Sequence, residues 1–216
     1  MSSLEKYFQP FRDQIIGIDQ TFVSPFGEQQ LMYTDWTASG RLYRPIEEKL
    51  MNEFGPFVAN THTETSTSGA AMTLAYHEAR NIIKRHVNAD KNDVLITEGS
   101  GMTGVVNKFQ RILGLKVSEN LKEHTTIPED LKPIVFVSHM EHHSNQTSWM
   151  ETIAEVKIIP YLNDGKIDLD AFKVLLNKYN DRKLKIAAIT SCSNVTGVFT
   201  PYYEISEIMH KNNGLC

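Results

Sequence analysis

The chain has 216 residues, of which 41% are hydrophobic, and its formal net charge at pH 7 is -4. A chain of this length can bury a proper core, and its slightly acidic balance offers no footprint for nucleic acid or for an anionic membrane surface. We therefore expect small molecules or proteins as partners, with no nucleic acid and no membrane among them.

The N-terminus, which reads MSSLEKYFQPFRDQ, has neither the apolar centre of a signal peptide nor an arginine-rich transit pattern. No apolar run approaches the length of a membrane span. Cys192 and Cys216 are too few for a disulfide framework and lack the spacing of a zinc ribbon or a redox pair. We expect a cytoplasmic protein.

The first third of the chain predicts a hairpin and two helices. Apolar residues at 22–23 and 31–34 flank turn material at 24–27, which predicts a hairpin outside the main core. Pro45 near the start and Gly55 just past the end bracket the first helix. The second helix, at about 69–87, carries one apolar stripe at helical spacing: Met72, Ala75, Tyr76, Ala79, Ile82 and Ile83.

The rest of the chain alternates between strand and helix patterns. Strands are expected at 94–97, 134–138, 155–159 and 184–190, and helices at 102–113, 169–179 and 203–211. This order predicts an α/β fold with a mostly parallel sheet, right-handed crossovers and helices on both faces. The polar connection at 116–132 is expected at the surface.

A glycine-rich turn follows the first of these strands and reads Gly99-Ser100-Gly101. Glycine lets backbone N–H groups approach an anion closely, and the positive end of the next helix points at the same spot. The turn predicts a phosphate cradle, although neither the P-loop spacing nor GxGxxG is present. A turn with only a structural role is the alternative.

Histidines gather where the strand at 134–138 ends. His139, His142 and His143 fall within five residues, together with Glu141 and Asn145. Ligands of open α/β sheets sit just beyond the carboxyl ends of strands, so this turn is a predicted functional site. A solvated surface turn is the alternative.

A zinc site is a further alternative, because His139, His142 and His143 have the i, i+3, i+4 spacing of one helix face. It needs a helix where a strand has just ended, and neither HExxH nor HxxEH is matched. We expect no metal site.

A third strand end carries Asn194. The apolar run at 185–190 leads into small polar residues, which places Asn194 on the ligand side of the expected sheet. The alternative is a simple turn-forming asparagine before Gly197.

Together these segments resemble the class V aminotransferase family of fold type I pyridoxal-phosphate enzymes, and within it the cysteine desulfurase and selenocysteine lyase branch. The resemblance rests on the Gly-Ser-Gly helix start, on MEHHSN from Met140, and on SNVTG from Ser193. The segment YTDWTAS from Tyr33 fits the entry motif Tyr-x-Asp-x-Ala-Ala-Ser of that branch, although Trp36-Thr37 departs from it.

The resemblance implies pyridoxal 5'-phosphate as the cofactor. It implies that Ser100, Gly101 and Met102 meet the phosphate, with Met102 standing where related enzymes usually carry an acidic residue. His142 would stack on the pyridine ring and act in proton transfer as the catalytic residue, and Asn194 would reach the ring oxygen or the substrate carboxylate. Such a planar electron sink with a dianionic tail needs a helix N-terminus, an aromatic lid and polar groups around its ring.

The resemblance also implies an N-terminal portion of a larger enzyme. Residues 1–30 would belong to the small domain or its entry, and residues 31–216 would form an incomplete cofactor-binding large domain. The Schiff-base lysine, the substrate arginine and any sulfur-carrying cysteine would lie beyond residue 216, since His210-Lys211 falls on an amphipathic helix with a surface role.

We expect the intact protein to be a homodimer that acts on an amino acid, and this chain alone to be inactive. The pattern does not choose among desulfuration, transamination and elimination. A catalytically inactive binding or regulatory module is the alternative.

Overall fold

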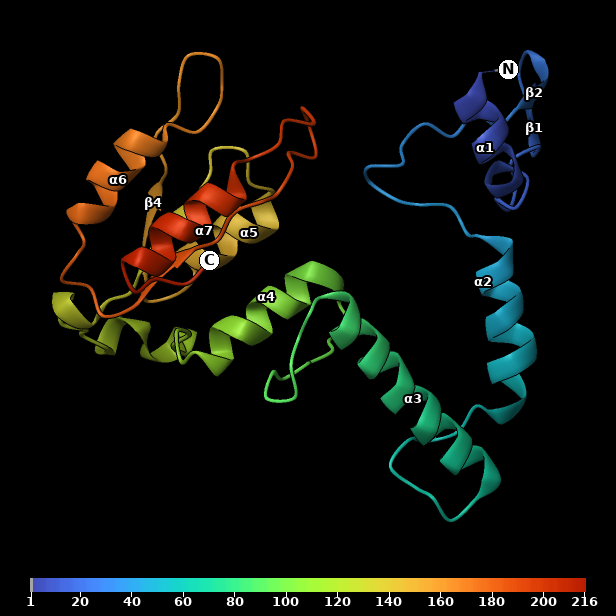
Figure 1. Cartoon of the computed structure of the whole chain (residues 1–216), viewed down its shortest axis with the longest axis horizontal. Helices are drawn as coiled ribbons and strands as arrows, with labels where there is room; N and C mark the ends of the chain where they lie inside the picture. Colours follow the sequence, from blue (N-terminus) through green and yellow to red (C-terminus); the bar gives the residue numbers. More distant parts are fainter. Residues whose placement is uncertain (1) are drawn as a thin grey trace. The chain divides into compact units, whose positions relative to one another are not determined.

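The computed structural model describes residues 2–216, which contacts divide into two compact units, Met1–Leu95 and Ile96–Cys216 (Figure 1). The predicted domain boundary at residue 30 stays a prediction.

The first unit contains helices and one hairpin and has almost no core. Its elements are α1 (Ser3–Arg12), β1 (Thr21–Ser24), β2 (Gly27–Gln30), α2 (Arg44–Lys49), a π-helical turn (Leu50–Phe54), a 3-10 turn (Gly55–Phe57) and α3 (Thr67–His86). Among residues 2–95, only Gly69 and Thr73 are buried. The predicted apolar stripe of α3 is therefore not in a core: Ile82 is 51% exposed and Ile83 is 44% exposed, because no second apolar layer of this unit covers them.

Local signals explain where these elements begin. Ser2 caps α1 in a reciprocal capping box with Glu5. Pro45 stands in the first turn of α2, as predicted. The hairpin is confirmed, but its second strand is Gly27–Gln30 rather than 31–34. The reason is that the two-residue turn brings Ser24 and Gly27 directly opposite each other, so pairing starts at the turn.

The predicted strand at 94–97 is wrong. No strand forms there, and Val94 is 79% exposed. A strand needs a neighbour that takes up its backbone groups. The Leu95 carbonyl instead accepts a hydrogen bond from the Arg80 guanidinium at 2.9 Å, so the segment forms an irregular connection.

The second unit is a parallel sheet with helices on both faces, as the sequence predicts. Its elements are α4 (Gly101–Ile112), two 3-10 turns (Glu119–His124 and Glu129–Leu131), β3 (Ile134–Val137), α5 (His143–Met150), β4 (Glu155–Ile158), α6 (Leu169–Asn177), β5 (Lys185–Ala187) and α7 (Tyr202–Lys211). The strand order is β4-β3-β5, and every pairing is parallel. Beyond β5, Leu215 forms a parallel bridge with Ile186.

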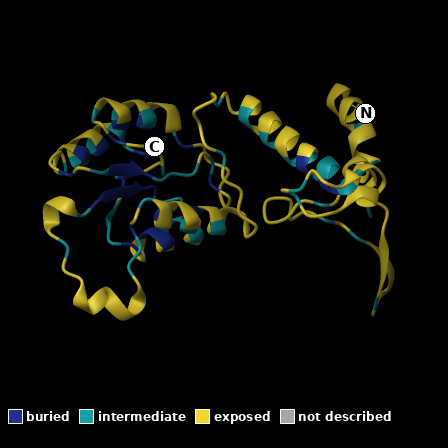
Figure 2. Cartoon of the chain, turned by 90° about the horizontal axis from the view of Figure 1, so that it is seen from below, coloured by how far each residue is buried: buried dark blue, intermediate teal, exposed yellow. Residues whose placement is uncertain are grey.

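Strand β3 lies at the centre of the core and is completely buried (Figure 2). Ile134 and Phe136 face the helices α6 and α7, where they pack with Phe172 and Met209. The alternate residues Val135 and Val137 face the opposite side and pack with Trp149 of α5 and Val106 of α4. A strand buried on both faces has no polar alternation, which is why this run reads as continuously apolar.

Helix α4 packs by a narrower face than its sequence pattern predicts. Val106 and Gln110 are buried, whereas Met102 is 70% exposed and Phe109 is 43% exposed. The helix rests on α5 through Gln110, whose Nε2 donates to Ser148 Oγ at 3.0 Å. This contact with one neighbouring helix covers only part of the apolar face.

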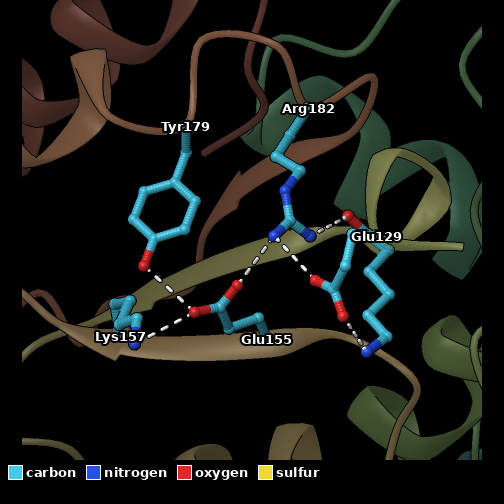
Figure 3. Close-up of polar contacts among 6 residues, drawn as sticks. Glu129, Glu155, Lys157, Tyr179 and Arg182 are labelled. Atoms are coloured by element: carbon cyan, nitrogen blue, oxygen red, sulfur yellow. Dashed lines mark hydrogen bonds and ion pairs between the residues drawn. The ribbon is translucent and has the colours of Figure 1, made fainter.

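A buried arginine ties the amino ends of the strands together (Figure 3). The Arg182 guanidinium donates to the Lys132 carbonyl at 2.9 Å, to Glu155 Oε2 at 2.9 Å and to Glu129 Oε2 at 3.2 Å. Tyr179 Oη donates to the other oxygen of Glu155 at 3.0 Å. The cluster lies at the opposite edge of the sheet from the polar turns that follow the strands.

Among the described residues, we find no helix that combines the length and the apolar character needed to cross a membrane.

Candidate functional site

The carboxyl edge of the sheet opens into a cleft. The chain leaves β3 toward α5 on one face and leaves β5 toward α7 on the other, so the two connections diverge. Diverging connections between adjacent strands leave a crevice in which α/β folds bind ligands. A cavity of about 360 Å³ lies here, lined by His139, Met140, Glu141, Asp164, Gly165, Ser193, Asn194, Val195, Thr196 and Val198.

The Glu141 carboxylate joins the segments that border the cleft. Its Oε1 accepts hydrogen bonds from Ser138 Oγ at 2.6 Å, from Ser138 N at 3.3 Å and from Thr190 N at 2.8 Å. Its Oε2 accepts from Asn145 Nδ2 at 2.8 Å. β5 ends at Ala187 and does not continue to residue 190 as predicted. The Ala188 carbonyl and the Thr190 amide bind the side chains of Asn145 and Glu141 and not a neighbouring strand.

Asn145 is fixed in one orientation by its other partners. Its Nδ2 also donates to the Ala188 carbonyl at 2.9 Å, and its Oδ1 accepts from Trp149 Nε1 at 2.9 Å. Trp149 is 2% exposed and belongs to the core. The turn after β3 is thus anchored to the core through a buried indole.

His142 caps helix α5. Its Nδ1 accepts a hydrogen bond from Ser144 N at 3.2 Å and lies 2.8 Å from Ser144 Oγ. With Nδ1 acting as an acceptor, the neutral ring carries its proton on Nε2. His142 is exposed, and the cap holds its ring through Nδ1.

The other two histidines have different surroundings. His139 stacks on Tyr161 with a centroid separation of 4.2 Å, and its Nδ1 is buried without a hydrogen-bond partner among residues 2–216. His143 begins α5 and its ring is tilted by 58° from that of His142. Only His143 lies within the helix, so the three rings do not share a helix face. Residues 2–216 contain no group of three His, Cys, Asp or Glu side chains arranged to hold a metal ion.

Asn194 lines the cleft, and the turn around it does not depend on its side chain. Ser193 Oγ accepts from Val195 N at 3.3 Å and from Thr196 N at 3.2 Å, and Gly197 supplies the positive φ of 71°. In the described part of the chain, the Asn194 side-chain amide forms no hydrogen bond. The simple turn-forming role therefore belongs to Ser193 and Gly197.

The glycine-rich turn precedes α4. Ser100 caps this helix without any side-chain hydrogen bond, so no side chain occupies the free N–H groups of the first turn. Gly101 has φ 64°, a conformation that favours glycine. A Cβ at Gly104 would lie 2.8 Å from Ser100 Cβ, so the third glycine lets Ser100 lie against the helix. Ser100, Gly101, Met102 and His142 are not among the residues that line the cavity.

The turn after β4 contributes a charged residue, Asp164, to the lining of the cavity, and the sequence alone did not predict this. Hydrogen bonds from the Lys166 backbone and side chain hold the pKa of Asp164 below its ordinary value of 3.8. Asp164 is therefore ionised at neutral pH. The Leu-Asn-Asp-Gly sequence at 162–165, typical of a tight turn, is the signal that could have indicated it.

The apparent His-Lys pair near the end of the chain lies on the surface, as predicted. His210 and Lys211 are in α7, and Lys211 Nζ pairs with Glu207 at 2.7 Å.

The family model for aminotransferase class V matches residues 32–216. The chain belongs to this family. Among its relatives, a probable cysteine desulfurase of Halalkalibacterium halodurans is 29% identical over 189 residues, which are 86% of the present chain and 43% of that protein. A cysteine desulfurase of Synechococcus elongatus is 27% identical over 185 residues, which are 84% of the chain and 27% of that protein. The present chain thus spans less than half the length of these relatives.

Solved structures agree on the fold. A cysteine desulfurase from Thermococcus onnurineus, in its apo form, superposes with a TM-score of 0.67 at 19% identity. The superposition covers 95% of the present chain and 45% of the Thermococcus protein. A cysteine desulfurase from Escherichia coli superposes with a TM-score of 0.62 at 20% identity. Here the superposition covers 96% of the present chain and 47% of the Escherichia coli protein. The predicted α/β architecture of a fold type I enzyme, incomplete relative to these structures, is confirmed.

Proposed function

We propose that this chain forms part of a pyridoxal 5'-phosphate site that serves a reaction on an amino acid. The observation that carries the proposal is the free amide of Asn194 on the wall of the cleft. Ser193 and Gly197 already satisfy the turn, so the turn itself does not require an asparagine at this position. A polar group presented in this way at the carboxyl edge of a parallel sheet is suited to a ligand.

The residues present fit the cofactor. The uncapped first turn of α4, with Ser100, Gly101 and Met102, offers N–H groups and a helix dipole to a phosphate dianion. The described residues that line the cavity include Asp164, whose carboxylate pairs with Lys166 Nζ at 3.1 Å, and no lysine or arginine, so we assign the phosphate to α4 and not to this wall. That wall, with Asn194, suits the polar rim of a ring or an amino-acid substrate.

His142 would cover one face of the ring. Its cap on α5 orients the imidazole, and Nε2 carries the proton that the residue could donate. When bound, pyridoxal phosphate supplies an electron sink for charge that develops on the substrate. The protein's own part is to bind the phosphate, to orient the ring and to hold a proton at Nε2.

The finer reaction is proposed from the relatives. The cysteine desulfurases among them favour an amino-acid substrate of that kind for the intact protein. We further propose that the intact protein is a cytoplasmic homodimer, that residues 1–30 belong to its small domain or the entry to it, and that the 216-residue chain alone is inactive.

Titration with pyridoxal phosphate, followed by absorbance, tests the proposal on the 216-residue chain. We expect reversible binding that weakens about tenfold in His142→Asn, which keeps the helix cap but removes the stacking ring. Asn194→Ala should weaken binding similarly. His143→Asn is the matched control and should bind like the wild type.

Two results would contradict the proposal. Equal binding by the wild type, His142→Asn and Asn194→Ala would remove these side chains from the site. Borohydride reduction followed by peptide mapping should find no single stoichiometrically modified lysine, and one such lysine would overturn the proposed inactivity.

A further inference from the structure

We propose that Glu141 is a positioning residue, whose carboxylate holds His142 and Asn194 at the separation that the cofactor site needs. The inference rests on the proposed function. Glu141 itself is not assigned to the cofactor; it acts through the two loops that its oxygens join.

The carboxylate is bound entirely by neutral donors. Ser138 and Thr190 donate to Oε1, and Asn145 donates to Oε2. None of the ion pairs within residues 2–216 includes Glu141. Hydrogen bonds to an ionised acceptor are stronger than bonds between neutral groups, so this one charge ties three segments together.

Both oxygens must be acceptors, which an amide cannot provide. If glutamine replaced Glu141 with its oxygen toward Thr190 N, its NH2 group would face the Asn145 NH2 group. Asn145 cannot turn over, because Trp149 and the Ala188 carbonyl fix its two ends. The opposite orientation of the glutamine would place its NH2 group against the backbone amides of Ser138 and Thr190.

Short chain segments connect Glu141 to both proposed cofactor contacts. His142 is the next residue. On the other side, Thr190 Oγ1 donates to the Cys192 carbonyl at 2.8 Å, and Ser193 then caps the turn that carries Asn194. The bond from Thr190 N to Glu141 is thus a direct link, at 2.8 Å, between the loop after β3 and the loop after β5.

Amide hydrogen exchange of the cofactor-free chain tests the link itself. In Glu141→Gln, exchange at residues 190–194 should become about tenfold faster, because neither orientation of the glutamine satisfies both the Thr190 amide and Asn145 Nδ2, so the link between the two loops is weakened. Ser138→Ala is a second test variant, for the case that Glu141→Gln folds poorly. It removes one donor and keeps the carboxylate, so exchange at residues 190–194 should become faster, but by less than in Glu141→Gln. Glu151→Gln is the matched control at the end of α5, where Glu151 has only an exposed Lys122 at 3.9 Å. Exchange at 190–194 that stays at the wild-type rate in both test variants overturns the proposal.

Pyridoxal-phosphate titration tests whether the link serves the site. Binding should weaken about tenfold in Glu141→Gln. The urea concentration at which hydrogen exchange shows β3 to unfold should stay near that of Glu151→Gln, so that the weaker binding does not reflect global unfolding. Faster exchange with unchanged affinity would overturn the positioning role. A wild-type chain that does not bind pyridoxal phosphate would overturn the proposed function, and the exchange rates would then decide alone whether Glu141 joins the loops.

Discussion

Arg182 shows how a single side chain can stabilise the edge of a sheet. It is 9% exposed, and its guanidinium contacts a backbone carbonyl and two carboxylates that belong to different segments. Its planar fork matches this set of acceptors, which an ammonium group could not satisfy together.

Replacing Arg182 should destabilise the second unit. Arg182→Met leaves the Lys132 carbonyl and Glu155 Oε2 without the donor that Arg182 supplies, so we expect a loss of about 1–3 kcal/mol in the free energy of unfolding. The stability of Arg182→Lys should lie between those of the wild type and Arg182→Met. Arg111→Met, at an exposed position of α4, is the control and should change little. Urea unfolding measures all three, and equal stability of Arg182→Met and Arg111→Met would contradict the role.

The same cluster predicts a loss of stability in acid. Burial raises the pKa of Glu155, but hydrogen bonds from Lys157 and Tyr179 and the charges of Lys157 and Arg182 outweigh it, so this pKa lies below the ordinary 4.5. The hydrogen bond from Lys132 likewise lowers the pKa of Glu129.

A carboxyl group with a lowered folded-state pKa stabilises the protein above its unfolded-state value and stops doing so as the pH falls through the folded value. The contribution of these two carboxylates to stability should therefore be constant above about pH 5 and should fall below about pH 4.5. Unfolding in urea across this range measures the effect. Arg182→Met should show a shallower pH dependence, and an identical profile would argue against the cluster as the source.

At the scale of elements, the contact between α4 and α5 contains a buried amide that is only half satisfied. Gln110 is 0% exposed, and its Oε1 has no hydrogen-bond partner among the residues that the structure describes. Ser148, which accepts from Gln110, also donates to the Asn145 carbonyl at 2.9 Å and keeps that bond without Gln110.

Gln110→Met should therefore be tolerated. It removes an unsatisfied polar atom and preserves the volume, so the free energy of unfolding should stay within about 1 kcal/mol of the wild type or rise. Gln110→Ala leaves a cavity and should cost about 2 kcal/mol or more. Thermal unfolding of both variants gives the comparison. A loss in Gln110→Met as large as in Gln110→Ala would show that the Gln110 hydrogen bond stabilises the contact.

At the scale of the whole molecule, the two units differ in how much they bury. Strand β3 is fully buried between two apolar clusters, whereas the first unit buries only Gly69 and Thr73 among its described residues. Burial of apolar surface is the main term that offsets the loss of chain entropy.

Hydrogen exchange should therefore separate the units. Amides of α3 should exchange through low-energy openings, at rates at least about a hundredfold faster than those of β3. The hairpin amides of β1 and β2 should behave like α3. Uniform protection of α3 and β3 would show that the first unit is stabilised by packing that its own contacts do not reveal.

The sequence by itself determined the layers of the second unit. A fully apolar strand at β3 and amphipathic patterns at α6 and α7 predict a parallel sheet covered on both faces, because burial requires these patterns. The turns that carry His142 and Asn194 come after β3 and β5, as the sequence predicts, whereas the strand expected before Ser100 does not form. The resemblance, rather than periodicity, supplied the proposed roles of these residues.

Tertiary structure decided what depends on distant partners. The segment at 94–97 has the composition of a strand, but its Leu95 carbonyl binds Arg80 and no neighbouring strand takes up its backbone. Glu141 reads locally as one charge in a polar turn, and only the fold brings the Thr190 amide, 49 positions away, to its carboxylate. Periodicity reports which residues can be buried, whereas hydrogen-bond partners remote in sequence are chosen by the packed chain.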